Sequence, residues 1–132
     1  MELISTHICL AKDIGVHNNL FGGVMLAWLD EAGAALAAQI TNTPRVVTVK
    51  LDGVEFVKPV KVGNLIKIYG EVKEFGTTSV TLRLVAKKES PYTRTQKVVC
   101  STSIKFVRID GDGETVPISE RVKKEHAKQN KT

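Results

Sequence analysis

Two adjacent acidic residues inside an apolar segment are the first candidates for chemistry. The segment Val16–Ile40 begins as a glycine-containing loop and continues as an almost wholly apolar stretch, with Asp30 and Glu31 near its middle. A carboxylate in apolar surroundings loses solvation, so it is either paired with polar groups or placed for catalysis. In the catalytic interpretation Asp30 is a general base that orients water, or a nucleophile. In the structural interpretation backbone groups or a Ser or Thr hydroxyl satisfy it.

The glycine pair Gly22–Gly23 lies at the start of the same apolar stretch. The first N–H groups of a helix have no intrahelical partner, and the helix dipole favours negative charge there. Glycines allow a ligand to approach these groups, which is the geometry of an oxyanion site. The pair also suits a plain helix cap, and both interpretations stay open. Asp30 follows about two turns later and projects from mid-helix, whereas Glu31 points about 100° away, toward the surface or an interface.

Two loops add polar candidates. In the first loop His17 either forms a local hydrogen bond or contacts a substrate, and Asn18 and Asn19 suit a turn that tolerates positive φ. In the second loop a glycine and three hydroxyls, in a tight turn between two strands, could contact a phosphate or an amide, or form an ordinary hairpin. These four residues are Gly76, Thr77, Thr78 and Ser79.

The elements that position these residues follow from the hydrophobic pattern. A short strand is predicted over Ser5–Leu10, and a helix from Gly22 to about Gln39. The helix is apolar almost all round, which predicts burial on most of its faces. It ends before Pro44, which cannot continue it.

From Arg45 onward the pattern has a period of two and predicts four strands joined by short loops. The apolar parity changes after Gly53, which predicts a bulge or bend within one long strand. Short loops favour antiparallel neighbours, so the predicted architecture is α+β, with one long helix against an antiparallel sheet. The far face of the sheet is expected to stay uncovered and partly apolar, which suggests a partner subunit. Its apolar residues are Val85, Val99 and Val107.

Length and composition restrict the class of protein. The chain has 132 residues, 42% of them hydrophobic and 25% charged, which is typical of one globular domain. We expect this domain over residues 1–118 and a charged, solvated or frayed tail over residues 119–132. Cys9 and Cys100 are expected to be buried free thiols. The amino-terminal residues do not form a signal peptide, so a cytoplasmic location is expected.

The composition and the motifs argue against several classes of partner and cofactor. The net charge of +5 comes with only 5% aromatic residues and no interleaved basic and aromatic strand, so no nucleic acid partner is expected. Asp30 would cost about 2.5–3.5 kcal/mol at the centre of a membrane span, so no membrane insertion is expected. No nucleotide-binding loop, dinucleotide fingerprint or metal-binding motif is present.

Three segments in this order resemble the acyl-CoA thioesterases of the hotdog fold, and most closely the YciA-like acyl-CoA hydrolase family. They are HNNLFGGVMLAWLDEAGA from His17, RVVTVKLDGVEFVKPVKVGN from Arg45 and GTTSVTLRLVAKK from Gly76. The resemblance extends from about His7 to Val107. The family usually carries Asn-Gly-Asp or a similar run ahead of its Phe-Gly-Gly, where this chain has His17-Asn18-Asn19. Other hotdog thioesterases also use a histidine near this place.

The resemblance implies hydrolysis of acyl-CoA to a fatty acid and CoA, without a metal and with no cofactor beyond the CoA of the substrate. It implies a long helix wrapped by the sheet, and a dimer whose sheets join edge to edge, often assembled into a hexamer as a trimer of dimers. Active sites would lie at the dimer interface. The catalytic carboxylate falls on Asp30, and the glycines whose amides polarise the carbonyl fall on Gly22 and Gly23. The CoA-binding turn corresponds to Gly76–Ser79, and Lys58 to a basic position near the CoA phosphates.

Two other functions are compatible with parts of this pattern. A hotdog dehydratase would act on hydroxyacyl thioesters with a His/Asp pair, for which His17 and Asp30 are candidates, but their spacing and the Phe-Gly-Gly context favour a thioesterase. A non-catalytic acyl-CoA-binding or regulatory domain is the other alternative. The intact Asp30 argues against it.

Overall fold

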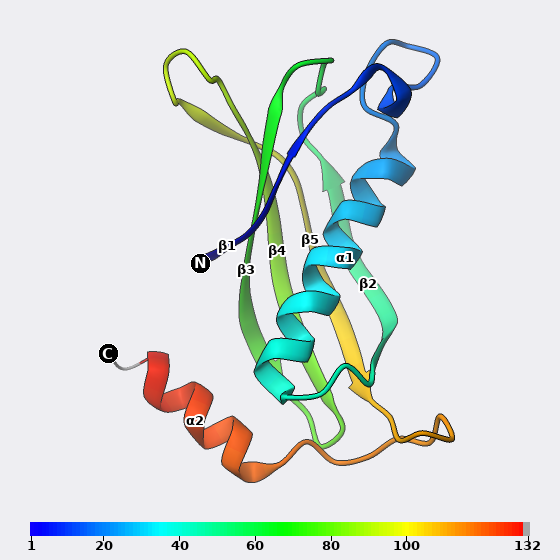
Figure 1. The fold of residues 1–132 in the computed structure, drawn as a ribbon, viewed down its shortest axis with the longest axis vertical. Helices are drawn as coiled ribbons and strands as arrows, with labels where there is room; N and C mark the ends of the chain where they lie inside the picture. The colour runs from blue at the N-terminus through cyan, green and yellow to red at the C-terminus, as the bar shows by residue number, and fades with distance from the viewer. Residues whose placement is uncertain (131–132) are drawn as a thin grey trace.

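A long helix lies across one face of a five-stranded antiparallel sheet in the computed structural model, which describes residues 1–130 (Figure 1). The strands have the order β1-β3-β4-β5-β2, so β1 and β2 are the two edges of the sheet. This is the α+β arrangement that the pattern and the resemblance predicted. The elements are β1 (Glu2–Ile8), the short 3-10 helix η1 (Ala11–Asp13), α1 (Gly22–Thr41), β2 (Val46–Phe56), β3 (Leu65–Phe75), β4 (Ser79–Glu89), β5 (Gln96–Arg108) and α2 (Glu120–Asn130).

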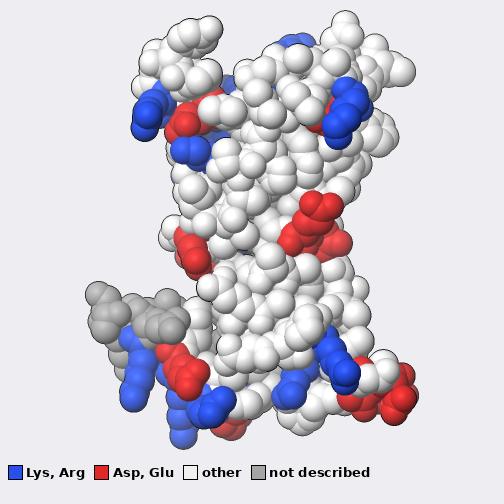
Figure 2. Space-filling model, viewed as in Figure 1, with Lys and Arg blue, Asp and Glu red and all other residues white. Residues whose placement is uncertain are grey.

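Helix α1 buries one stripe against the sheet and leaves another exposed. Its C-cap residue is Asn42, which has φ of 59° and donates its N–H to the Ala38 carbonyl. The buried stripe contains Met25, Leu29, Ala32, Gly33, Leu36 and Ala37. The exposed stripe contains Gly23, Ala27, Glu31, Ala35 and Gln39. Apart from this one stripe the residues of α1 are buried or half-buried, which agrees with the predicted burial on most faces. Figure 2 shows Lys and Arg toward the ends of the viewed face and a largely uncharged middle with some acidic groups.

Two glycines set how closely α1 approaches the sheet. A Cβ atom at Gly33 would lie 2.9 Å from Leu84 Cδ1 and 2.9 Å from Phe106 Cζ. A Cβ atom at Gly70 of β3 would lie 2.8 Å from Leu84 Cδ2 and 2.9 Å from Leu36 Cδ2. All of these partners belong to the buried core, so the missing side chains allow the helix and sheet to interlock.

The predicted bulge at Gly53 is confirmed. The register between β2 and β5 shifts between Asp52 and Glu55, and Gly53 has φ of +62°. The buried Thr102 hydroxyl of β5 donates to the Asp52 carbonyl at 3.1 Å, which satisfies an acceptor beside the bulge.

The first strand covers Glu2–Ile8 rather than the predicted Ser5–Leu10.

A second register shift corrects the prediction for the far face of the sheet. Ala86 pairs with Cys100 and Lys87 with Val98, so Val99 is an extra residue on β5. Val99 is consequently buried in the core with Cys100, not on the far face. Both cysteines are buried and free, as predicted, and burial raises the pKa of the Cys100 thiol to about 11.

The charged carboxyl-terminal segment is helical where it is described, although most of its side chains are exposed to solvent. Residues Glu120–Asn130 form α2, and the hydrophobic side chains Ile118 and Val122 are buried in the core. His126 of α2 also packs its ring edge-on against Phe75 at 5.7 Å between centroids.

In the described part of the chain, neither helix combines the length and the apolar character that a membrane span requires.

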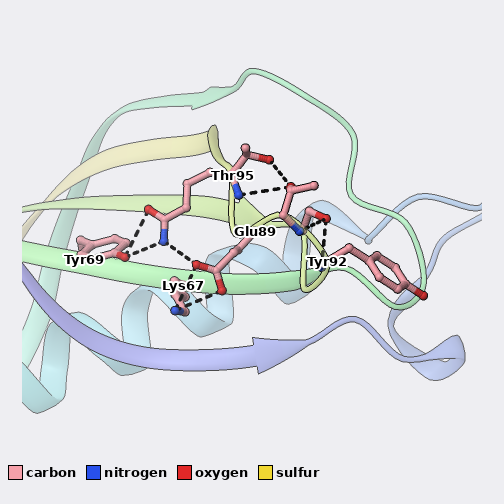
Figure 3. Close-up of polar contacts among 8 residues, drawn as sticks. Lys67, Tyr69, Glu89, Tyr92 and Thr95 are labelled. Carbon is pink, nitrogen blue, oxygen red and sulfur yellow. Dashed lines mark hydrogen bonds and ion pairs between the residues drawn. The ribbon is translucent and has the colours of Figure 1, made fainter.

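A polar cluster joins β3, β4 and β5 beside the β4–β5 hairpin (Figure 3). Gln96 Nε2 donates to Glu89 Oε1 and to the Tyr69 hydroxyl, both at 3.0 Å, and Lys67 Nζ lies 3.2 Å from Glu89. The hydrogen bond from Gln96 and that from Lys67 lower the pKa of Glu89. All four side chains are satisfied within this cluster, so we assign it a structural role.

We predict that Gly33→Ala lowers the free energy of unfolding. Overpacking a core typically costs about 1–3 kcal/mol, whereas replacing a helical glycine by alanine gains at most about 1 kcal/mol. Urea titration of the variant and the parent measures the difference. Gly22→Ala is the matched control, because its added methyl would meet the Phe56 ring at an ordinary 3.4 Å. Equal or greater stability of Gly33→Ala would contradict the close packing described above.

Candidate active site

The start of α1 presents two backbone donors without acceptors. Phe21 is the N-cap residue, and its carbonyl accepts the N–H groups of Val24 and Met25 at 3.0 and 3.2 Å. Within residues 1–130 no group accepts a hydrogen bond from the Gly22 or Gly23 amide. Gly23 is exposed and Gly22 half-buried, so a ligand can reach this end of the helix. The geometry suits a developing negative charge.

Asp13 fixes the approach of the chain to this helix end. Its Oδ2 accepts the Leu10 N–H at 2.9 Å, its Oδ1 lies 3.3 Å from Lys12 Nζ, and its carbonyl accepts the Phe21 N–H at 2.9 Å. The Leu10 hydrogen bond is the largest cause that lowers the pKa of Asp13, and Lys12 adds to it. Asp13 could not be identified from the sequence, because both of its roles depend on neighbours that the local pattern does not identify.

The loop ahead of α1 forms the predicted turn. Asn18 has φ of 61°, and the Gly15 N–H donates a hydrogen bond of 2.8 Å to the Asn19 carbonyl. Lys61 Nζ donates to Asn19 Oδ1. His17 is exposed, and among the described residues its side chain has no hydrogen-bond or ionic partner. It is therefore available to a ligand.

Asp30 projects from the middle of α1 toward β2 and is half-buried. The Thr48 hydroxyl of β2 donates to Asp30 Oδ1 at 2.6 Å. This contact corresponds to the structural interpretation, but it involves one oxygen only. Within residues 1–130 no hydrogen bond reaches Oδ2, so Thr48 holds the side chain in place and leaves this second oxygen open to a further partner. Glu31 is exposed, as expected.

The two candidate groups on α1 cannot act on one atom within a single chain. Gly22 and Asp30 are eight residues apart in the same helix, which corresponds to roughly 12 Å along its axis at about 1.5 Å per residue. One carbonyl that binds the amide must also be attacked by a water that contacts the carboxylate. The amide and the carboxylate must therefore lie within a few ångströms of the same carbonyl. For such chemistry one chain would therefore supply two separate half-sites, one at the Gly22 amide and one at Asp30.

A cavity of about 400 Å³ lies beside the amide half-site. Gly22 and Met25 of α1 line it from one side, and the segment Phe56–Val60 from another. Two of the predicted binding residues, Asn19 and Lys58, also line it. The structure thus brings Gly22, Asn19 and Lys58 together.

The predicted CoA-binding turn lies elsewhere in the chain. It joins β3 to β4 at the end of the sheet opposite to the start of α1 (Figure 1). Its backbone is engaged: the Thr77 carbonyl accepts the Ile118 N–H at 2.9 Å, and the Thr78 carbonyl accepts the Arg108 N–H at 2.8 Å. Thr77 is exposed, whereas Ser79 is buried. Within one chain this turn cannot join Lys58 around one ligand.

No group of three or more His, Cys, Asp or Glu residues in the described part of the chain is arranged to hold a metal ion. Thr48 was not predicted from the sequence as a partner of Asp30. The period-two pattern assigns Thr48 to the strand face opposite that of Val47 and Val49, but only the fold shows that α1 lies over that face.

Comparisons with known proteins agree on one family. The model of the thioesterase superfamily matches residues 17–95. The acyl-CoA thioester hydrolase YciA of Salmonella typhimurium is 32% identical over 121 residues, which cover 89% of this chain and 90% of that protein. The YciA protein of Escherichia coli is 30% identical and covers 85% of this chain and 86% of its own length. A hexameric hotdog fold thioesterase of Campylobacter jejuni matches with a TM-score of 0.88 and 30% identity, over 96% of this chain and 97% of that one.

We predict that the stabilising effect of Asp13 depends on pH. Its pKa is lowered in the folded state, so its contribution is present above the unfolded-state pKa of about 3.9 and is lost as the pH falls through the folded-state pKa. Asp13→Asn should therefore lower the melting temperature at pH 7, and the difference from the parent should shrink toward pH 2. Asp112→Asn, an exposed carboxylate, is the control. An equal effect of Asp13→Asn at both pH values would contradict this role.

Proposed function

The chain belongs to the thioesterase superfamily, and we propose that it hydrolyses the thioester bond of acyl-CoA to give a free fatty acid and CoA. The observation that carries this proposal is the pair of unpartnered amides at Gly22 and Gly23, which open beside a cavity that reaches Met25 of the core. The similarity to enzymes named acyl-CoA thioester hydrolases supports the same activity.

In the proposed reaction the thioester carbonyl oxygen accepts hydrogen bonds from the Gly22 and Gly23 amides. Asp30 Oδ2 takes a proton from water while the water oxygen bonds to the carbonyl carbon, and negative charge collects on the carbonyl oxygen. The carbon–sulfur bond then breaks, and the CoA sulfur leaves as a thiolate that takes up a proton. In the alternative, Asp30 attacks the carbonyl carbon and water hydrolyses the resulting mixed anhydride. Both routes need only water, and CoA is part of the substrate and product.

A homo-oligomer is required to join the two half-sites. The separation of roughly 12 Å along α1 means that Asp30 of one copy acts on a carbonyl held by the Gly22 amide of another. The edge strand β2 is the proposed contact, because Val47, Val49 and Leu51 are exposed along an unpaired strand edge.

Antiparallel pairing of two β2 strands about a two-fold axis near Asp52 would set Thr48 of one copy opposite Phe56 of the other. Thr48 binds Asp30, and Phe56 lines the cavity beside Gly22. The proposed dimer therefore completes two equivalent active sites. Assembly of three dimers into a hexamer is proposed by analogy with the hexameric thioesterase of Campylobacter jejuni.

The remaining candidate residues are assigned to CoA. His17, Asn18 and Asn19 lie in the loop beside the cavity, and Lys58 offers an exposed ammonium group to phosphate. The turn Gly76–Ser79 would contact CoA from a neighbouring copy, since it lies at the other end of its own chain. We propose a cytoplasmic location, in which the two free cysteines stay reduced.

We predict that Asp30→Asn lowers turnover by about 10²–10⁴-fold, the typical contribution of general-base catalysis. The amide retains an oxygen for the Thr48 hydroxyl, so the melting temperature and CoA affinity should change little. Thiol release from a panel of acyl-CoA substrates measures turnover. Glu31→Gln, on the exposed stripe of the same helix, is the matched control.

Turnover within a few-fold of the parent would contradict the catalytic role of Asp30. Release of no thiol by the parent, with conversion of a hydroxyacyl-CoA to an unsaturated product, would instead indicate the dehydratase alternative. Binding of acyl-CoA with neither product would indicate a non-catalytic domain.

We predict that Gly22→Pro lowers turnover by about 10²–10³-fold, the usual effect of removing one oxyanion donor. Proline lacks the N–H and is favoured at the first position of a helix, and Phe21 already has the extended conformation with ψ of 134° that proline requires before it. The fold should therefore be preserved.

Mixed oligomers of Gly22→Pro and Asp30→Asn test whether the site is shared. In a randomly mixed dimer population, about one site in four would combine an intact amide with an intact carboxylate from the partner. Co-refolding the two inactive variants should therefore restore roughly a quarter of the parental turnover. If mixing restores no activity, the two groups act within one chain and the proposed dimer site is wrong.

A further inference from the structure

A second cavity lies on the β3 side of the molecule and shares no lining residue with the cavity beside Gly22. Its volume is about 650 Å³, and it is bounded by the amino terminus, β3, the second half of α1 and α2. Its apolar floor is formed by side chains that are buried or half-buried, namely Leu36, Ile40, Val72 and Val122. In Figure 1 the amino terminus lies above α2 on this side of the sheet. This cavity is therefore a separate candidate for binding.

One wall of this second cavity is an unpaired strand edge. β1 pairs with β3 only from Leu65 to Gly70, so the stretch Glu71–Phe75 is paired on its β4 side alone. Within residues 1–130 no other backbone group forms a hydrogen bond with that stretch. Its outward N–H and C=O groups are therefore available to another strand, over roughly 17 Å at about 3.4 Å per residue. We call the stretch Glu71–Phe75 the open edge of β3.

The lining of the second cavity is acidic, although the chain carries a net charge of +5. In the part of the chain that the structure describes, no Lys or Arg lines it. Its ionisable groups are the carboxylates of Glu2, Glu71 and Glu125, the His126 ring and the Met1 amino group. Lys73 of the open edge is exposed and lies outside the lining. Electrostatic complementarity therefore favours a cationic partner.

We propose that the open edge and the cavity beside it form a docking site for an extended basic peptide segment of another protein. The segment would add a strand antiparallel to β3, in line with β1 and with its carboxyl end toward the start of β1. Successive side chains of a strand point to opposite faces. Apolar side chains at alternate positions would enter the cavity over Leu36 and Ile40. The basic side chains between them would meet Glu71 of the edge and Glu125 of the opposite wall.

The charge of the lining argues against a second copy of this chain as the occupant. Pairing two open edges would bring two acidic linings to one junction, where like charges destabilise strand pairing. The docking site also shares no residue with the catalytic groups proposed above or with the β2 edge proposed for dimerisation. Its test is therefore independent of the proposed function.

Hydrogen exchange of the intact protein, resolved to single residues by mass spectrometry, tests the docking site. The probe is acetyl-Lys-Val-Lys-Val-Lys-amide at millimolar concentration, and acetyl-Glu-Val-Glu-Val-Glu-amide is its charge-reversed control. We expect the Lys peptide to slow the amides of Glu71–Phe75 that point away from β4. The slowing should be roughly tenfold when about nine-tenths of the sites are occupied, because exchange then proceeds from the unoccupied fraction. The Glu peptide should leave these amides unchanged.

Two N-methylated forms of the Lys peptide separate strand addition from charge attraction. Only alternate N–H groups of an added strand face β3. Methylation of the Val amides or of the Lys amides should therefore abolish the slowing in one form and preserve it in the other. If both forms slow exchange as the unmodified peptide does, no strand is added and the inference is overturned.

The variants Glu125→Lys and Glu120→Lys make the same change of charge on α2, but only Glu125 lines the cavity. Both residues are exposed and each has one ion pair within α2, with Arg121 at 3.7 Å and with Lys123 at 3.5 Å. In calorimetry Glu125→Lys should raise the dissociation constant of the Lys peptide roughly fivefold or more, since one exposed ion pair contributes up to about that factor. Glu120→Lys should leave it nearly unchanged.

Three results would overturn the docking site. One is unchanged exchange of the open edge with the Lys peptide, or equal slowing by the Glu peptide. Another is an equal effect of Glu125→Lys and Glu120→Lys on the dissociation constant. The third is slow exchange of the outward amides of Glu71–Phe75 in the protein without peptide, which would mean that a neighbouring copy already covers the edge.

Discussion

The close contact between α1 and the sheet is the constraint on which the rest of the molecule depends. Gly33 of the helix and Gly70 of β3 both lie against Leu84, and neither position has room for a side chain. Because cores are packed as densely as crystals, this contact fixes the helix against the sheet. Every candidate group on α1 therefore has a fixed position, which catalysis by orientation requires.

The rigidity of α1 also explains why a single chain would be insufficient for the proposed reaction. The Gly22 amide and Asp30 are separated by a fixed length of helix, and no rearrangement of a packed helix can bring them to the same carbonyl. The Thr48 hydroxyl holds Asp30 close to β2, the edge strand of the sheet. The carboxylate consequently lies beside the strand on which a second copy is proposed to dock, so the proposed assembly and the proposed catalysis would depend on the same edge.

Features with a local cause could be predicted from the sequence, and features that depend on distant partners could not. The helix and the bulge at Gly53 follow from periodicity and from a glycine at a change of parity. Val99 was assigned to the wrong face, because no glycine marks the extra residue in β5. Helix α2 was missed because its charged composition concealed the buried Val122. Asp30, Gly22 and Gly23 are exposed or half-buried as a site requires, whereas Thr48 and Asp13 emerged only when the fold supplied their partners.

Two of the bulges in the sheet, at Gly53 of β2 and at Val99 of β5, relate directly to the cavity beside α1. In a regular β5, Val99 would point away from the helix, because neighbouring residues of a strand face opposite sides. The extra residue turns Val99 inward, and the bulge at Gly53 restores apolar residues to the inner side of the last part of β2. Bulges often occur next to functional sites because they redirect side chains at little cost to the remaining pairing. In this fold the regular part of the sheet fixes the helix, and the irregular part shapes the space beside the Gly22 amide.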